Sequence, residues 1–392
     1  MVDFKKPILN KNGKPLKILQ AAAHFCIRVV KRGVALKSLG YEVHGMGNKL
    51  PYGYGIYDTY GAWSDEKQFK REIKHYIDSG IDILDYSNEP DYPVQWVREV
   101  INDMGKQDEV KLVVDLHDLD SIRRGFIPKP EREMFNCADG LIYVSQSIEE
   151  MTNKLHYYNK PTITLLSYCN KGTAKYDEDK IPERKGLVYE GGANPPEDTD
   201  LNAMFSYRSL YQIIKKLVEM ENEVHMYCGN ISAFESYQPT GAVLYPPTMY
   251  DKMMEELVKY KYGILVFNNA DGQKDQVNYT HSNKQQEYLQ AGMPSLACWC
   301  PEMMKWVEHH KIGFTFNHID EIGNCSQLEN KYPEVMENIK QKRKDLVMES
   351  FLWRLENLYA ELLGLPKKKI PKRIKELSIF EYGEENTHRL LN

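Results

Sequence analysis

The segment HSNKQQEYLQAGMP, residues 281–294, combines residue types suited to binding a phosphorylated ligand. A helix is expected to begin near Asn283, and Ser282 can cap it by accepting a backbone N–H of the first turn. The free amides at such a helix start attract anions and would suit a diphosphate. Lys284 stands in the first turn, where a cation is unfavourable against the helix dipole unless an anion is nearby. The segment therefore predicts an anion site.

Glu287 follows one turn later, on the same helix face as Asn283 and Lys284. A carboxylate can accept two hydrogen bonds at once, which matches the paired hydroxyls of a ribose. The ordinary alternative is an amphipathic helix whose charges are simply solvated. The Ala291-Gly292 pair is expected to end the helix.

Short apolar runs alternate with longer helix-period segments along the chain, and this rhythm predicts parallel βαβ units. It breaks between Asn170 and Lys185, in a stretch of Lys, Asp, Glu, Gly and Pro, and then restarts. Strands are expected at Leu16–Ala21, Tyr41–Met46, Ile81–Tyr86, Lys111–Leu116, Gly140–Ser145, Thr162–Leu166, Gly186–Glu190, Glu223–Cys228, Ala242–Tyr245, Tyr262–Phe267 and Ser295–Cys300.

The expected fold class is α/β, with two Rossmann-like, doubly wound parallel-sheet domains facing a cleft. We expect one domain over residues 1–170 and a second over 171–345. Residues 346–392 would form a helix returning toward the first lobe and a basic tail. Ligands of such sheets lie beyond the carboxyl ends of the strands.

The sequence HSNKQQEYLQAGMPSLACWCPEMMKWVEHHKIGFTF resembles the donor-site motif of GT-B glycosyltransferases, especially the retaining family four (glycosyl transferases group 1). The resemblance implies that Glu287 binds the ribose of a nucleotide-sugar donor and that Lys284 contacts its diphosphate or sugar. The amides of Ser282 and Asn283 would contact the phosphates.

The resemblance extends upstream, through GLVYEGGA, VHMYCGN and AVLYPPTMYDKMMEEL, at residues 186–193, 224–230 and 242–257. These segments resemble the family's first strand with its glycine loop, its second strand, and the stretch that usually packs on the nucleobase. They place Gly191, Gly192, Gly229 and Thr248 in the expected donor site.

The sequence also departs from the family pattern. Tyr279 stands where many members carry the earlier of two glutamates. The loop after Ala193, NPPEDTD, is acidic where many members place Arg and Lys against the diphosphate. The first loop, AAAHFCIR, has His24 and Arg28 in place of two glycines.

In the first lobe, VVDLHDLDSIRRG places His117 directly after an expected strand. Family members often have a histidine there, so the resemblance implies that His117 is catalytic, with Asp118 as its partner. An imidazole can donate to a sugar hydroxyl or to the leaving oxygen. The alternatives are a loop histidine and, more weakly, a metal site of His117, Asp118 and Asp120. The SNEP segment, residues 87–90, either lines the acceptor side or is a simple turn.

Composition restricts the remaining classes. The chain has 392 residues, 42% hydrophobic and 27% charged, which fits a globular protein rather than a disordered one. Its net charge of −5 disfavours a general nucleic-acid binder. Its seven cysteines show no disulfide or zinc spacing and are expected to be reduced thiols. Without an apparent signal peptide or membrane span, a cytoplasmic location is expected.

The basic tail KKKIPKRIK, Lys367–Lys375, is expected to be a solvated terminal segment. The alternative is a contact with anionic lipid or with a nucleic-acid acceptor, because clustered cations attract phosphates.

The resemblance implies a glycosyltransferase that moves a sugar from a UDP- or GDP-linked donor to an acceptor hydroxyl, and it alone implies retention at the anomeric carbon. The acceptor would be a glycan, a lipid-linked sugar or a small molecule, and no cofactor or metal is expected. A GT-B sugar-nucleotide epimerase, a phage-type glycosyltransferase acting on modified DNA, and a two-lobed sugar-binding protein stay open. A nicotinamide dehydrogenase is disfavoured because no G-x-G-x-x-G follows an expected strand.

Overall fold

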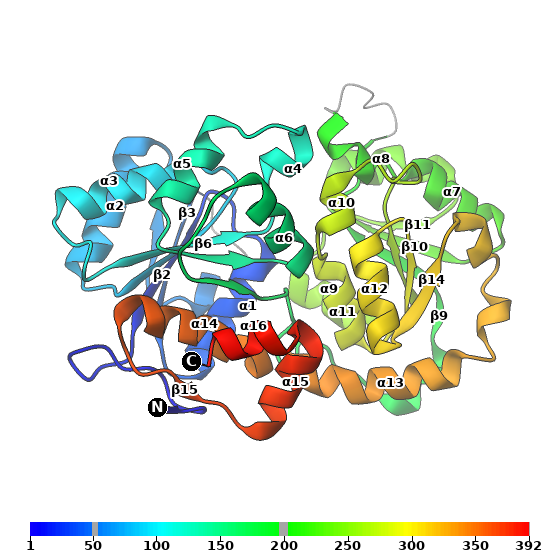
Figure 1. Cartoon of the computed structure of the whole chain (residues 1–392). Helices are drawn as coiled ribbons and strands as arrows, with labels where there is room; N and C mark the ends of the chain where they lie inside the picture. Colours follow the sequence, from blue (N-terminus) through cyan, green and yellow to red (C-terminus); the bar gives the residue numbers. More distant parts are fainter. Residues whose placement is uncertain (49–53, 196–202, 392) are drawn as a thin grey trace. The chain divides into compact units, whose positions relative to one another are not determined.

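A computed structural model describes residues 1–48, 54–195 and 203–391. The chain divides into two compact units (Figure 1). The first unit comprises Met1–Asn170 together with Val347–Asn392, and the second comprises Lys171–Leu346.

The first unit is built on a seven-stranded parallel sheet with the order β4-β3-β2-β5-β6-β7-β8. Its strands are β2 (Lys17–Ala22), β3 (Glu42–Gly47), β4 (Tyr60–Ala62), β5 (Ile83–Ser87), β6 (Lys111–Leu116), β7 (Gly140–Tyr143) and β8 (Thr162–Thr164). Its helices are α1 (Ile27–Ser38), α2 (Glu66–Asp78), α3 (Pro93–Asp103), α4 (Asp120–Arg124), α5 (Lys129–Cys137), α6 (Gln146–Leu155), α14 (Met348–Leu363), α15 (Lys372–Tyr382) and α16 (Glu384–Arg389). The strand order changes direction between β2 and β5, which makes this the switch point of the sheet.

The second unit has a six-stranded parallel sheet with the order β11-β10-β9-β12-β13-β14. Its strands are β9 (Lys185–Gly191), β10 (Val224–Cys228), β11 (Val243–Tyr245), β12 (Tyr260–Val266), β13 (Ser295–Cys298) and β14 (Gly313–Phe316). Its helices are α7 (Tyr211–Glu219), α8 (Ile231–Ser236), α9 (Tyr250–Leu257), α10 (Asp275–Tyr279), α11 (Asn283–Ala291), α12 (Pro301–His310) and α13 (Tyr332–Asp345). The switch point lies between β9 and β12. The expected α/β class with doubly wound parallel sheets is confirmed.

Short 3-10 helices complete both units, and a two-stranded parallel sheet joins the chain ends. The 3-10 helices are η1 (Tyr54–Ile56), η2 (Glu178–Glu183), η3 (Ala203–Arg208), η4 (Gln238–Thr240), η5 (Ile319–Ile322) and η6 (Ser326–Leu328). The terminal strands are β1 (Val2–Asp3) and β15 (Lys368–Lys369).

Both faces of the second sheet are buried. Consecutive residues of a strand point to opposite faces, so Leu187 and Val188 of β9 enter separate apolar clusters. Helix α11 packs closely on β12, because a Cβ atom at Gly263 would lie 2.4 Å from the ring of Tyr288. This contact holds the helix that carries the predicted donor residues against the sheet.

The first unit contains a fully buried ion network between α1 and the sheet. Arg28 donates to Asp115 at 2.9–3.0 Å, and Arg32 pairs with both Asp115 and Asp85. Burial would raise the pKa of Asp115, but the two guanidinium groups hold it well below its ordinary value. Tyr359 of α14 donates to Asp85 at 3.0 Å. Arg28 is therefore a core residue, although the sequence placed it on the first loop.

The expected elements differ from the structure mainly where the apolar pattern is short. The three-residue strand β4 and the strand β14 were not expected, because neither shows a clear alternation over several residues. The apolar pattern also predicts a helix over Leu201–Met220, but α7 begins only at Tyr211, after the 3-10 helix η3; residues 196–202 lie outside the described residues.

The basic tail is folded rather than wholly solvated. Strand β15 pairs with β1, and Lys368 is only 2% exposed. Its Nζ lies 2.6 Å from a carboxylate oxygen of Glu356 and donates to the carbonyls of Phe4 and Lys6. The expectation of a solvated segment was wrong for Lys368, because a buried carboxylate draws its ammonium into the core. Among the described residues, no helix is both long and apolar enough to cross a membrane.

Candidate functional site

Helix α11 starts at the predicted residue. The Oγ of Ser282 accepts from the backbone N–H of Lys284 at 3.4 Å, and this residue is the N-cap of the helix. Ser282, Asn283 and Lys284 are all partly exposed, whereas the rest of the helix is buried. The exposed end of α11 is therefore its amide-bearing, anion-attracting end.

Two glycine loops meet this helix start at the switch point of the second sheet. Gly191 ends β9 with a φ of +115°, and a Cβ atom there would lie 3.2 Å from the Nζ of Lys284. Gly229 follows β10, and its N–H donates to the carbonyl of Gly191 at 2.9 Å. A Cβ atom at Gly229 would come within 3.0 Å of the Gly191 backbone. Both positions thus favour glycine, and Gly191 brings backbone close to the ammonium of Lys284.

The Lys284 ammonium lies in an apolar and aromatic setting. Its Nζ is 5.2 Å from the ring centroid of Tyr189 and 5.3 Å from that of Phe267. Burial lowers the pKa of Lys284; the Glu190 carboxylate opposes this shift and the nearby Arg208 guanidinium adds to it. A bound anion would relieve the repulsion between these two cations.

Arg208 is a candidate donor residue that the sequence reasoning missed. It ends η3, and its Nη1 lies 3.6 Å from the Cβ position of Gly192. Its guanidinium also stacks over the rings of Phe205 and Tyr207, at 5.6 and 5.4 Å. Arg208 thus brings a cation close to Gly192 from farther along the chain. The sequence could have indicated Arg208 because it is the lone arginine shortly after the acidic loop. Residues 196–200 of that loop lie outside the described residues.

Glu287 lies one turn after Lys284, and its charge opposes the lowering of the Lys284 pKa that burial causes. Its side chain is only 2% exposed, so a ribose reaches the carboxylate only if the side chains covering it move. The next residue, Tyr288, fixes the helix by donating to the carbonyl of Ile264 at 3.1 Å. The structure places Glu287 beside Lys284, as predicted, and its role in ribose binding stays a prediction.

Thr248 and Tyr279 lie outside helix α11 and outside the two glycine loops. Thr248, between β11 and α9, donates its hydroxyl to the carbonyl of Pro246 at 2.8 Å. Within the described part of the chain, no hydrogen bond joins it to Gly191 or Lys284. Tyr279 is the last residue of α10.

The predicted residues of the first unit gather at the carboxyl ends of β5 and β6. The Nε2 of His117 lies 3.6 Å from a carboxylate oxygen of Glu89, and its Nδ1 lies 3.4 Å from the Ser87 hydroxyl. Asn88 accepts from the His117 N–H at 3.2 Å and donates to the Asp118 carbonyl. The SNEP segment is therefore part of the His117 cluster rather than a separate turn.

Charge in this cluster is balanced by Arg123 of α4. Its side chain is 3% exposed and pairs with both Asp118, at 2.5 Å, and Glu89. Glu89 has a φ of +74°, which is uncommon for a non-glycine residue and requires support from its surroundings. The Arg123 and His117 contacts supply that support.

The same contacts keep His117 protonated. Burial alone would lower the pKa of His117, but the neighbouring carboxylates of Glu89 and Asp118 outweigh it and the pKa is raised to about 10. For Glu89, burial is likewise outweighed, and its pKa falls to about 2. At neutral pH this site therefore presents an imidazolium, which can donate hydrogen bonds but cannot accept a proton.

Glu89, His117 and Asp118 could also hold a metal ion by residue type, since their ligand atoms lie within 4.8 Å of one another. The metal alternative from the sequence named Asp120 instead, which pairs with Arg124 at 3.2 Å. Because the Arg123 guanidinium binds both carboxylates of the trio, we assign the cluster to an ion-pair network.

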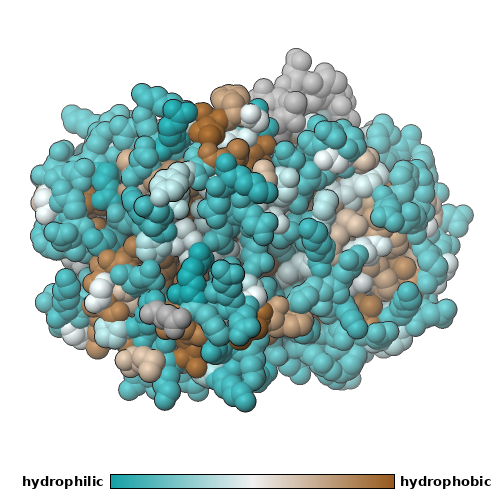
Figure 2. All heavy atoms as spheres, viewed as in Figure 1, coloured by the Kyte–Doolittle hydropathy of each residue, from teal (hydrophilic) through white to brown (hydrophobic). Residues whose placement is uncertain are grey.

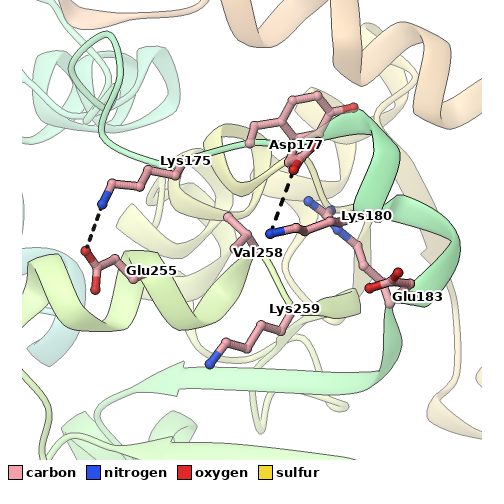
Figure 3. Close-up of a pocket in the computed structure, with 9 residues that line it drawn as sticks. Lys175, Asp177, Lys180, Glu183, Glu255, Val258 and Lys259 are labelled. Carbon is pink, nitrogen blue, oxygen red and sulfur yellow. Dashed lines mark hydrogen bonds and ion pairs between the residues drawn. The ribbon is translucent and has the colours of Figure 1, made fainter.

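A separate pocket of about 750 Å³ lies between the segment preceding β9 and helix α9 (Figure 3). Figure 3 shows Lys175 directed toward Glu255, and Lys180 toward Asp177. None of the nine residues that line this pocket is a predicted site residue. The pocket therefore does not mark the expected donor site.

Comparison of the whole chain with solved structures identifies proteins of the same architecture. One is the sucrose-phosphate synthase of Thermosynechococcus elongatus, with 11% identity and a TM-score of 0.64 over 89% of this chain and 99% of that chain. The chain has the GT-B fold. WaaG, a glycosyltransferase involved in lipopolysaccharide biosynthesis, matches with 9% identity and a TM-score of 0.56, over 87% of this chain and 99% of that chain.

AviGT4, a glycosyltransferase involved in avilamycin A biosynthesis, matches this GT-B chain with 11% identity and a TM-score of 0.55, over 91% of this chain and all of the other. No protein-family model and no curated protein sequence matches the chain. At these identities the likeness shows the fold, and the function has to be argued from the sites.

Proposed function

We propose that this GT-B protein is a glycosyltransferase that moves a sugar from a UDP- or GDP-linked donor to an acceptor hydroxyl. The observation that supports this most is the convergence of Gly191, Gly229 and Lys284 at the exposed start of α11. Arg208 adds a second cation beside Gly192. Open backbone, the N-terminal end of a helix and two cations form a site suited to a diphosphate.

In the proposed reaction, the bond between the anomeric carbon and the diphosphate oxygen breaks, and the electron pair stays on that oxygen. Lys284, Arg208 and the α11 amides would stabilise the charge that develops there, a contribution of several kcal/mol in other enzymes. The acceptor oxygen bonds to the anomeric carbon, and its proton passes to the departing diphosphate oxygen. This step needs no cofactor or metal ion, because cationic side chains and amides take the role of the charge-stabilising group.

We further propose that His117 donates a hydrogen bond to an oxygen of the transferred sugar, with Asp118 and Glu89 maintaining its charge. A histidine with a pKa of about 10 is a poor general base at neutral pH. The poor basicity of His117 agrees with a retaining reaction. An inverting reaction by direct displacement would need a base to deprotonate the acceptor, and a retaining one does not need such a base in the first unit.

The experiment is a turnover assay with UDP- and GDP-linked sugars and a panel of glycan, lipid-linked and small-molecule acceptors, followed by release of the nucleoside diphosphate. Lys284→Ala should lower kcat/KM by about 10²–10³-fold, as loss of a charge-stabilising donor does in other enzymes. Lys305→Ala, at an exposed residue of α12, serves as the control and should be unaffected.

Equal turnover by the wild type and Lys284→Ala would refute the role of Lys284. Conversion of the donor in the absence of every acceptor would point to the epimerase instead. NMR of the product's anomeric proton decides between retention and inversion.

A further inference from the structure

The two ends of the chain form one folded, basic surface on the first unit. Strand β1 pairs in parallel with β15, and the buried ammonium of Lys368 binds the carbonyls of Phe4 and Lys6. Figure 1 shows the dark blue N-terminal segment and the orange-red C-terminal segment along the same edge of this unit. The basic tail is therefore continued by the N-terminal residues rather than extending alone.

We call this surface the terminal basic face and define it by the exposed cations of residues 1–14 and 367–375. These residues are Lys5, Lys6, Lys11, Lys14, Lys369, Lys372 and Arg373. The exposed carboxylates in residues 1–14 and 367–376 are Asp3, which accepts from the Lys5 N–H, and Glu376, which lies 3.7 Å from Lys372. The face is thus strongly positive in a protein whose net charge is −5.

Exposed apolar side chains lie within the N-terminal segment and just beyond the C-terminal one. Met1 is 89% exposed, Leu9 45% and Phe380, on α15, 43%. Apolar surface also interrupts the hydrophilic surface along the lower edge of the first unit in Figure 2. Cations interspersed with protruding apolar side chains are typical of proteins that lie on an anionic membrane surface, with the apolar groups at the acyl boundary.

We propose that the terminal basic face docks the protein on a membrane surface rich in anionic lipid headgroups. The cations bind the headgroup phosphates, and Met1, Leu9 and Phe380 enter the interface. Phosphates of nucleic acid would also attract the cations, but they offer nothing to aliphatic side chains such as Met1 and Leu9. Lys368 does not contact the membrane in this proposal. Its buried ammonium is paired with Glu356 and holds the two segments together. This inference does not depend on the proposed sugar transfer.

The test is co-sedimentation of the full chain with vesicles of phosphatidylcholine containing 0 or 30% phosphatidylglycerol, in low and in high salt. Binding should require phosphatidylglycerol and should fall steeply with salt. In the triple variant Lys369→Glu, Lys372→Glu, Arg373→Glu, partitioning should fall more than 100-fold, since each cation near such a surface contributes roughly five-fold.

The matched control is Lys215→Glu, Lys252→Glu, Lys305→Glu, which makes the same change in charge at exposed residues of the second unit. It should bind vesicles like the wild type. Leu9→Ser with Phe380→Ser should weaken binding without abolishing its dependence on phosphatidylglycerol. Thermal melting checks that each variant is folded.

Absence of vesicle binding by the folded wild type would overturn the proposal. Equal loss in both triple variants would also overturn it, because attraction would then follow net charge alone. Binding to a 20-base-pair DNA duplex without binding to vesicles would assign the face to nucleic acid instead.

Discussion

At the residue scale, His117 is defined by the charges around it. The carboxylates of Glu89 and Asp118 carry negative charge, and the Arg123 guanidinium and the His117 imidazolium carry positive charge. The pKa of His117 is raised to about 10, so the group is expected to stay protonated over the whole physiological range. Its proposed role as a hydrogen-bond donor then needs no proton uptake during the reaction.

This gives a direct prediction for the titration of His117. Because its folded pKa is raised from an ordinary value near 6.5, its stabilising contribution is complete below pH 6.5 and is lost as the pH rises through about 10. The lowered pKa of Glu89 makes its contribution complete above pH 4.5 and lost as the pH falls through about 2. NMR of ¹³C-labelled histidine, assigned with His117→Gln, should show an imidazolium signal that is unchanged from pH 5.5 to 8.5. A midpoint between pH 6 and 7 would contradict the ion network.

At the element scale, α11 has cations at both ends. Its start carries Lys284, and its C-terminal carbonyls accept from two arginines. Arg184 donates to the carbonyls of Gly292 and Ala291, at 2.6 and 3.0 Å, and Arg343 donates to that of Gln290 at 2.7 Å. Cations at this end of a helix are stabilising. Tyr176 supports both guanidinium groups, at 5.5 and 4.1 Å from its ring centroid.

Removing one of these arginines should loosen the helix that positions the donor residues. Arg343→Ala should lower the free energy of unfolding by about 1–3 kcal/mol, because a charged hydrogen-bond donor is lost and a carbonyl is left without its partner. Lys344→Ala, at the exposed neighbouring residue of α13, should change it by less than about 0.5 kcal/mol. Urea denaturation of both variants measures the difference. Equal stability of the two would show that α11 does not depend on this contact.

Much of the architecture could be predicted from sequence because long, strongly apolar strands give a clear pattern. Strand β6 begins and ends at the predicted residues, and α11 begins at Asn283. The short strands β4 and β14 carry too few residues to establish a period. The sequence could indicate that Lys284 and Glu287 share a helix face, because that needs only the helical repeat.

The sequence could not indicate which distant residues join these sites. Arg208 reaches Gly192 through a 3-10 turn that no periodic pattern predicts. Glu89 and Arg123 join His117 because β5 and β6 are adjacent in the sheet, which depends on strand order. Arg28 looked like a loop residue until its partner Asp115 was seen in the core.

At the scale of the whole molecule, the C-terminal segment Val347–Asn392 returns to the first unit and is part of it. Lys368 joins the terminal strand pair to Glu356 of α14, and Glu356 also accepts from the Tyr41 hydroxyl at 2.5 Å. Burial raises the pKa of Glu356, while Lys368 acts to lower it. Removal of the ammonium would leave that carboxylate buried without its cation.

Lys368→Ala should therefore destabilise the first unit by about 3–5 kcal/mol, the usual cost of breaking one side of a buried ion pair. Lys369→Ala removes an exposed cation from the same strand and should be nearly neutral. Thermal unfolding followed by circular dichroism compares them. Similar melting temperatures for the two variants would show that the tail is not anchored through Lys368.

The start of α11 is proposed to hold a nucleoside diphosphate, and a thermal-shift titration with UDP, GDP and their sugars measures that binding. A ligand present at 100 times its dissociation constant should stabilise the wild type by about 2.7 kcal/mol. Glu287→Ala should remain folded and lose that stabilisation, because the ribose loses its carboxylate. Failure of every nucleotide to stabilise the wild type, or an undiminished shift in Glu287→Ala, would contradict the account.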